Sequence, residues 1–243
     1  MSDELARPEG SFRADARRSL TNAHTQDALD VATARLRANR LRAWDELDDI
    51  ESLREQGRAL RTATIDELDR YLDQFQRAVE ARGGRVHRCT DDAEARAKIV
   101  EICRTAGARL VAKSKSMASE EIHLNEVLEA EGMRVVETDL GEYILQLAGE
   151  HPVHIVAPAI EKTAADVARL LEAVDGEPVE PGLEALTAKA RRQLREVFLT
   201  ADVGVTGANF AVAETGSICL VTNEGNGRLV STLPRVHVAI LGL

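Results

Sequence analysis

Short apolar segments alternate with helical patterns from Gly84 to the end of the chain, and this alternation restricts the fold more than any other feature of the sequence. The pattern favours a strand at 85–89, a helix at 91–106 and a strand at 109–113. A strand, a helix and a strand in this order are typical of parallel strands joined by a right-handed crossover. The same reading predicts a helix at 119–131, strands at 133–137 and 153–157, helices at 163–176 and 183–201, and strands at 203–206, 217–222 and 236–241. We therefore expect an α/β fold, an open and mostly parallel sheet with helices on both faces.

The region before this alternation, residues 1–83, has the pattern of helices. It is nearly free of glycine and rich in charged residues, and its apolar residues recur at helical spacing. The sequence Thr64-Ile65-Asp66-Glu67 is a capping-box pattern that predicts the start of a second helix, which Gly83-Gly84 would end. We expect a helical hairpin at 1–83 in front of an α/β domain at 84–243. We interpret the charged residues of this hairpin as a face exposed to solvent; the alternative is that its apolar stripe docks a partner chain.

The overall composition excludes several classes of function. A formal net charge of −10 opposes binding to nucleic acid. No apolar run has the length needed to span a bilayer, and the first residues lack the pattern of a signal peptide, so we expect a cytoplasmic protein with no membrane span. The three cysteines, Cys89, Cys103 and Cys219, form no Cys-x-x-Cys pair. His123 has no second ligand at a suitable spacing, and we predict no metal site in this chain.

Two of the five lysines lie in one loop, between the strand predicted at 109–113 and the following helix. In open α/β sheets, ligands bind at the carboxyl ends of strands, where the start of a helix offers free N–H groups to an anion. A small anionic ligand, such as a phosphate or a carboxylate, is therefore the hypothesis for this loop, and a solvated basic turn is the alternative. The ligand-binding candidates here are Lys113, Ser114, Lys115 and Ser116.

The last part of the chain is rich in glycine and asparagine and almost free of charge. From Val203 onwards the charged residues are Glu214, Glu224, Arg228 and Arg235. Glu214 has small neighbours that leave it open to a substrate, and it is the candidate catalytic carboxylate; a carboxylate that fixes a turn is the alternative. Further ligand-binding candidates, expected to line one crevice with the lysine loop, are Thr206, Gly207, Asn209, Thr215, Gly216, Asn223, Glu224, Asn226 and Arg228.

Carboxylates also surround the strand predicted at 133–137. Glu137, Asp139 and Glu142 suit acid–base chemistry or metal binding if they converge, and capping of a helix by Thr138 or Asp139 is the alternative. Glu120 and Glu121 occupy a first helical turn, where the helix dipole favours carboxylates in any case. His154 alternates with apolar residues and is interpreted as a core histidine.

Several of these segments resemble the LUD domain of lactate-utilization proteins, in particular their LutB-like iron–sulfur subunit. The resemblance is carried by residues 113–125, 137–143 and 154–160 and by the long run 201–242. It implies a fold akin to the CoA-transferase and sugar-phosphate-isomerase group. It also implies a role in oxidising L-lactate to pyruvate, within a complex that passes electrons through iron–sulfur clusters.

The same resemblance implies two partners, a second LUD protein and a cysteine-rich iron–sulfur protein. Family members of this type continue into a ferredoxin-like region with cysteine motifs, whereas this chain ends at Leu243, in or just after an apolar strand. We therefore expect a LUD domain that is truncated at its C-terminus, with 4Fe–4S clusters only in the full-length family member and none bound by this chain. The alternatives are an enzyme or binder of acyl-CoA or another small molecule that uses Glu214, and a non-catalytic scaffold for partner subunits.

Overall fold

The computed structural model describes residues 16–17, 20–21, 23–150, 159–160 and 162–243. The chain divides into two units, Met1–Thr62 with Ile160–Lys162, and Ala63–Ala159 with Thr163–Leu243. The first unit contains helix α2 (Ala23–Asp45) and most of helix α3 (Ile50–Asp66). The apolar stripe predicted for these helices is largely exposed, and its exposed members are Leu36, Leu41, Leu47 and Leu53.

The start predicted for the second helix at Thr64 is wrong. Helix α3 continues through Asp66, and helix α4 (Leu68–Glu80) begins after Glu67, whose side chain makes no capping hydrogen bond. Residues 50–66 contain no proline, so the backbone has no reason to leave the helix at Thr64. The helical character of this region is confirmed by α2, α3 and α4, and the domain boundary at Gly84 stays a prediction.

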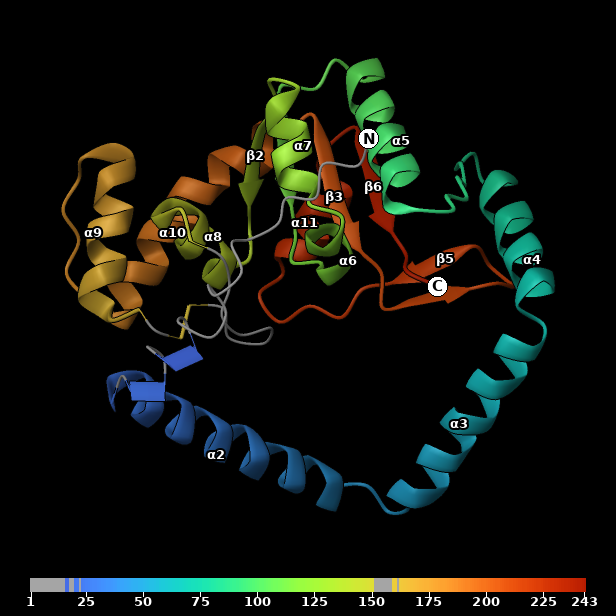
Figure 1. The fold of residues 1–243 in the computed structure, drawn as a ribbon, viewed down its shortest axis with the longest axis horizontal. Helices are drawn as coiled ribbons and strands as arrows, with labels where there is room; N and C mark the ends of the chain where they lie inside the picture. The colour runs from blue at the N-terminus through green and yellow to red at the C-terminus, as the bar shows by residue number, and fades with distance from the viewer. Residues whose placement is uncertain (1–15, 18–19, 22, 151–158, 161) are drawn as a thin grey trace. The chain divides into compact units, whose positions relative to one another are not determined.

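Four parallel strands form the sheet of the second unit (Figure 1). They are β1 (Leu110–Lys113), β2 (Arg134–Glu137), β3 (Val203–Gly207) and β6 (Val236–Ile240), in the spatial order β2-β1-β3-β6. All three neighbouring pairs run parallel, which confirms the predicted α/β fold.

Helices cover both faces of this sheet, as predicted. Val111 and Val203 face a core with α5 (Asp92–Thr105) and α7 (Leu124–Ala130), whereas Ala112 faces a core with α9 (Ala164–Asp175) and α10 (Leu183–Thr200). Neighbouring residues of β1 therefore serve opposite cores, because successive side chains of a strand point to opposite faces. The shorter helices of this unit are α6 (Met117–Glu121), α8 (Leu140–Ala148) and α11 (Asn226–Thr232).

Local sequence signals place several helix ends correctly. Asp91 accepts a hydrogen bond from Glu94 N at the start of α5, and Thr163 forms a complete capping box with Asp166 at the start of α9. The helix predicted at 119–131 is split instead into α6 and α7, because His123 adopts a left-handed conformation with φ of 48°. Helix α11 is not predicted from the sequence, and α8 is anticipated only by the alternative in which Thr138 or Asp139 caps a helix.

Two predicted strands of the sheet are wrong. Residues 85–89 form no strand, and only Val86 and Cys89 among them are half-buried, so this segment offers little apolar surface to a neighbour. The predicted strand 217–222 is shortened to β5 (Ser217–Cys219), which pairs with β4 (Phe210–Val212) in an antiparallel hairpin outside the main sheet.

The strand predicted at 153–157 and the core histidine His154 lie outside the described residues. Among the described helices, none combines the length and the hydropathy that a membrane crossing requires.

Candidate functional site

The carboxyl ends of the parallel strands bring polar residues from distant parts of the chain together. In the register of the sheet, Lys113 at the end of β1 lies beside Glu137 at the end of β2 and beside Val205 of β3. The loops that leave these strands therefore start from one edge of the sheet. This is the edge at which open α/β sheets bind their ligands.

Lys113 is fully buried, and its ammonium group is enclosed by acceptors. Nζ lies 2.8 Å from Glu137 Oε1 and 3.0 Å from Ser119 Oγ, and it also donates to Glu120 Oε1. Three acceptors match the three N–H donors of an ammonium group. The lysine is thus used inside the protein and has no donor left for a bound anion.

The charges of this group stabilise one another against the cost of burial. Burial by itself lowers the pKa of Lys113, but the Glu137 and Glu120 carboxylates outweigh it, and the pKa is raised. Burial raises the pKa of Glu137, and Lys113 and Asn125 oppose that change. The pair is therefore best described as an ammonium and a carboxylate that depend on each other.

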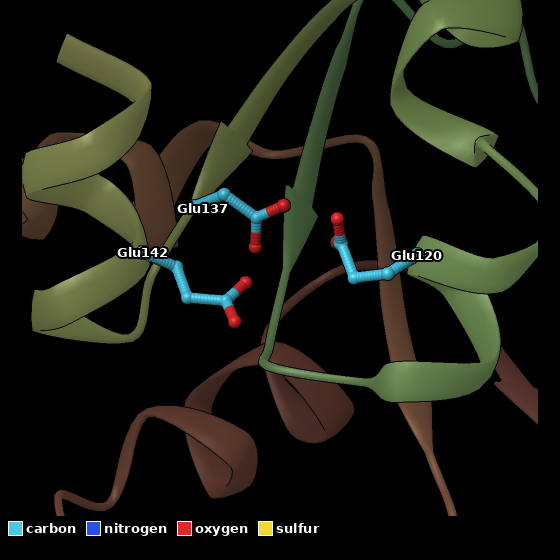
Figure 2. A group of neighbouring side chains, drawn as sticks. All are labelled: Glu120, Glu137 and Glu142. Carbon is cyan, nitrogen blue, oxygen red and sulfur yellow. The ribbon is translucent and has the colours of Figure 1, made fainter. Parts of the chain in front are cut away.

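Glu142, on α8, adds a third carboxylate to this edge (Figure 2). One carboxylate oxygen from each of Glu120, Glu137 and Glu142 lies within 4.8 Å of the others, and the three side chains point toward one another. Burial, reinforced by the charges of Glu137 and Glu120, raises the pKa of Glu142 to about 7. Glu142 Oε1 forms an ion pair with Lys115, whose Nζ lies 3.6 Å away.

We call Glu120, Glu137 and Glu142 the carboxylate cluster. Together with Lys113 and Lys115 the cluster has three acidic and two basic groups, so its full ionisation leaves an excess of one negative charge. A group of this composition is suited to hold a proton or a cation. The small anionic ligand expected at the lysine loop stays a prediction that rests on Lys115.

A second set of contacts connects the last part of the chain to the same edge. Thr138 Oγ1 donates to the Lys113 carbonyl at 2.9 Å, and Asn226 Nδ2 donates to Thr138 Oγ1 at 3.4 Å. Glu224 Oε2 accepts a hydrogen bond from Leu140 N at 3.2 Å, and partial desolvation raises its pKa. Asn226 and Glu224, both predicted site residues, thus lie close to the lysine loop.

The remaining residues of the lysine loop and of β3 have structural contacts. Ser116 caps α6 by accepting from Ser119 N, and Ser114 N donates to the Val205 carbonyl at 2.9 Å. Gly207 lies against this loop, since a Cβ there would be 2.9 Å from Ser116 Oγ. Thr206 is fully buried, and its Oγ1 shares a hydrogen bond of 2.8 Å with Nε2 of His237. Burial lowers the pKa of His237, which is not among the site residues predicted from the sequence.

Other predicted site residues are held by contacts of the β4–β5 hairpin. Glu214 and Thr215 lie in its turn, where Glu214 is exposed and Thr215 Oγ1 donates to Ser217 Oγ. Gly216 packs against α4, because a Cβ there would be 2.6 Å from the Val79 backbone nitrogen. Asn209 Oδ1 accepts from the nitrogen of Val221 at the base of the hairpin. Asn223 and Arg228 are exposed, and the ligand-binding or catalytic roles of all these residues stay predictions.

Asp139, predicted from the sequence to group with Glu137 and Glu142, is not part of the carboxylate cluster. Asp139 caps α8 by accepting from the Gly141 and Glu142 nitrogens, as its alternative interpretation required. Its place in the cluster is taken by Glu120, which the sequence analysis explained by the helix dipole alone. The parallel register of β1 and β2 explains why Glu120 and Glu142 meet, because it brings the segments that follow the two strands to the same edge of the sheet.

Comparison with known proteins shows the family to which this chain belongs. Residues 72–243 match the LUD domain. The uncharacterized electron transport protein YkgF of Escherichia coli K12 is 42% identical over 232 residues, which are 96% of this chain and 49% of that protein. Lactate utilization protein B of Bacillus subtilis 168 is 44% identical over 235 residues, again 96% of this chain and 49% of the relative.

A third relative, lactate utilization protein B of Bacillus cereus AH820, is 44% identical over 216 residues, which cover 89% of this chain and 46% of that protein. The chain thus spans about half the length of the curated relatives it matches. No solved structure matches the chain significantly.

Proposed function

The chain belongs to the LUD domain family, and from this membership we propose that it supplies the LUD portion of an iron–sulfur subunit in a complex that oxidises L-lactate to pyruvate. The observation that carries the proposal is the 44% identity to lactate utilization protein B over 96% of the chain, a span that includes the N-terminal helices. The relative named as an electron transport protein supports the electron-transfer part of the proposal.

In this proposal the iron–sulfur clusters lie outside this chain. A 4Fe–4S cluster needs four thiolate ligands, and the chain has three cysteines. The described cysteines differ in setting, since Cys103 is buried within α5 and Cys219 is exposed on β5. Burial raises the pKa of the Cys103 thiol to about 11, which disfavours the thiolate that a metal ligand requires. These residues do not fit a cluster, and the electron carriers are assigned to the rest of the full-length protein and to its partners.

The partners in the proposal are a second LUD protein and a cysteine-rich iron–sulfur protein. The exposed leucines of α2 and α3 support an interaction of this kind, because apolar side chains repeated along a helix favour association with another protein surface. A purely structural role for the chain in recruiting these subunits is the second candidate function, and the same leucines favour it.

A chimeric protein tests the proposal. The matching half of Bacillus subtilis lactate utilization protein B would be replaced by residues 1–243 and produced in a strain that lacks the native gene. We expect the chimera to restore growth on L-lactate, while growth on pyruvate, which needs no lactate oxidation, is the same with and without it. A chimera that accumulates with a normal iron content and still fails on L-lactate would contradict the proposed function.

The two candidate functions are separated by substitutions at the carboxylate cluster and on the helices. Glu142→Gln in the chimera should impair growth on L-lactate if the sheet edge takes part in the reaction, and should leave growth intact if the chain is a scaffold. Leu36→Lys with Leu53→Lys should impair growth only if α2 and α3 bind a partner. Co-purification of the partner subunits with each variant shows which of these interactions is lost.

A further inference from the structure

Two buried oxygen atoms at the carboxyl edge of the sheet have no hydrogen-bond partner. Within the part of the chain that the structure describes, Glu137 Oε2 and Asn125 Oδ1 are the buried side-chain atoms in this condition. Glu137 is only 3% exposed. An unsatisfied buried acceptor costs about 1–3 kcal/mol, and more if it is charged, so such a pair of atoms points to a missing donor or ion.

The existing contacts explain why these atoms have no protein partner. Glu137 Oε1 already accepts from Asn125 Nδ2 at 2.7 Å and lies 2.8 Å from Lys113 Nζ. The ammonium of Lys113 has used its three donors on Glu137, Ser119 and Glu120. Glu137 Oε2 is therefore without a protein donor, and its carboxylate belongs to the carboxylate cluster, where Glu120 and Glu142 also present oxygens (Figure 2).

We infer that Glu120, Glu137 and Glu142 bind one hard divalent cation of the class Mg²⁺, Mn²⁺ or Ca²⁺, with Glu137 Oε2 as one of the ligand atoms. Carboxylate and amide oxygens select such ions over soft metals. Metal–oxygen bonds of about 2.1 Å for Mg²⁺ and about 2.3–2.6 Å for Ca²⁺ place ligand oxygens on opposite sides of the ion up to about 4–5 Å apart. The spacing in the cluster, within 4.8 Å, agrees with that range.

The charges and the accessibility of the cluster also suit a cation. Three carboxylates against the ammonium groups of Lys113 and Lys115 leave one negative charge when all five groups are ionised, so the cluster attracts a cation. Lys115 contacts Glu142 only at 3.6 Å, so it does not hold the Glu142 carboxylate tightly. The side chain of Glu120 is 29% exposed and gives an ion a route from solvent. This site is independent of whether the chain serves lactate oxidation.

Calorimetric titration of the 243-residue chain, stripped with EDTA and dialysed, tests the inference with MnCl₂, MgCl₂ and CaCl₂ in separate experiments. We expect one equivalent of at least one ion to bind, and Glu142→Gln to weaken that binding at least about tenfold. Glu142 is chosen because it makes no contact with Lys113 in the ion pairs described above. The matched control is Glu126→Gln, an exposed carboxylate on the neighbouring helix α7, which should leave the affinity unchanged.

A folding control and a second variant keep the outcome interpretable. Far-UV circular dichroism and the thermal unfolding midpoint identify a variant that has lost its fold, and Glu120→Gln provides an independent loss of one ligand. The absence of saturable binding of all three ions, or an affinity that is unchanged in both folded variants, would overturn the inference. A chain that binds the ion but does not support growth on L-lactate would refute the proposed function alone.

Discussion

Replacing Lys113 with methionine tests the ion cluster most directly. Methionine has a similar length and no charge, so the main change is the loss of the ammonium that pairs with Glu137 and Glu120. Lys113 is fully buried and the side chain of Glu137 is 4% exposed, so the substitution leaves a buried carboxylate without its counter-charge. Removal of one member of a buried ion pair costs about 3–5 kcal/mol. A domain of this size is stable by about 5–15 kcal/mol, so the variant should lose a large part of its stability.

Urea unfolding followed by far-UV circular dichroism measures this change as a shift of the unfolding midpoint at constant slope. Lys115→Met is the matched control, because Lys115 lies in the same loop but is partly exposed and 3.6 Å from its carboxylate partner. Because the Lys115 ammonium is partly exposed and lies 3.6 Å from the Glu142 carboxylate, its loss should cost less than the loss of Lys113. The double variant Lys113→Met with Glu137→Gln should recover part of the loss, since it removes the charge left unpaired.

The explanation would be refuted if Lys113→Met cost less than about 1 kcal/mol, the value typical of exposed pairs. Equal losses in Lys113→Met and Lys115→Met would refute it as well, because burial would then have no influence. A double variant as unstable as the sum of its parts would show that Lys113 and Glu137 are not coupled.

Two further predictions concern the rest of the second unit. The hydrogen bond from Lys189 lowers the pKa of Asp175 to about 2 from its ordinary value of 3.8. The contribution of Asp175 to stability is therefore present above the unfolded-state pKa and is lost as the pH falls toward about 2. The thermal unfolding midpoints of the native chain and of Asp175→Asn should differ at about pH 5, and this difference should vanish near about pH 2. A Cβ at Gly204 would lie 2.0 Å from the Val230 carbonyl oxygen, and Gly204→Ala should cost about 1–3 kcal/mol or more by urea unfolding. Gly57→Ala, with open space around the added methyl, should be neutral or stabilising; equal losses in both alanine variants would show that the close approach of α11 to β3 is unimportant.

Local signals in the sequence were sufficient for the elements that depend on short-range contacts. The caps at Asp91 and Thr163 and the left-handed glycine at the end of α9, Gly176, each involve residues within a few positions along the chain. Strands β1 and β3 were recognised because both consist mainly of apolar residues and glycine, which suits central parallel strands buried on both faces.

The predictions were wrong where the secondary structure of a segment depends on which strand lies beside it. The apolar residues of 217–222 suit a strand of the main sheet and a strand of a small hairpin equally, and pairing with β4 rather than with β6 decides between them. The segment 85–89 pairs with no strand of the sheet, and only Val86 and Cys89 in it are half-buried, so it has little apolar surface to pack against a neighbour. The pattern of residue types along a segment indicates a preference for extended structure, but it does not specify which strand will lie next to that segment.

The amino-acid sequence by itself determined the α/β class of this protein, through the alternation of apolar strands and helices, and it placed Lys113 at the carboxyl end of a strand. Only the tertiary structure decided what that lysine does. Glu120 and Glu137 reach Lys113 from α6 and β2, and their convergence depends on the register that sets Lys113 beside Glu137. An ammonium group expected to meet a ligand is instead enclosed by carboxylates, because a buried charge is stable only when the fold supplies its counter-charge at hydrogen-bonding distance.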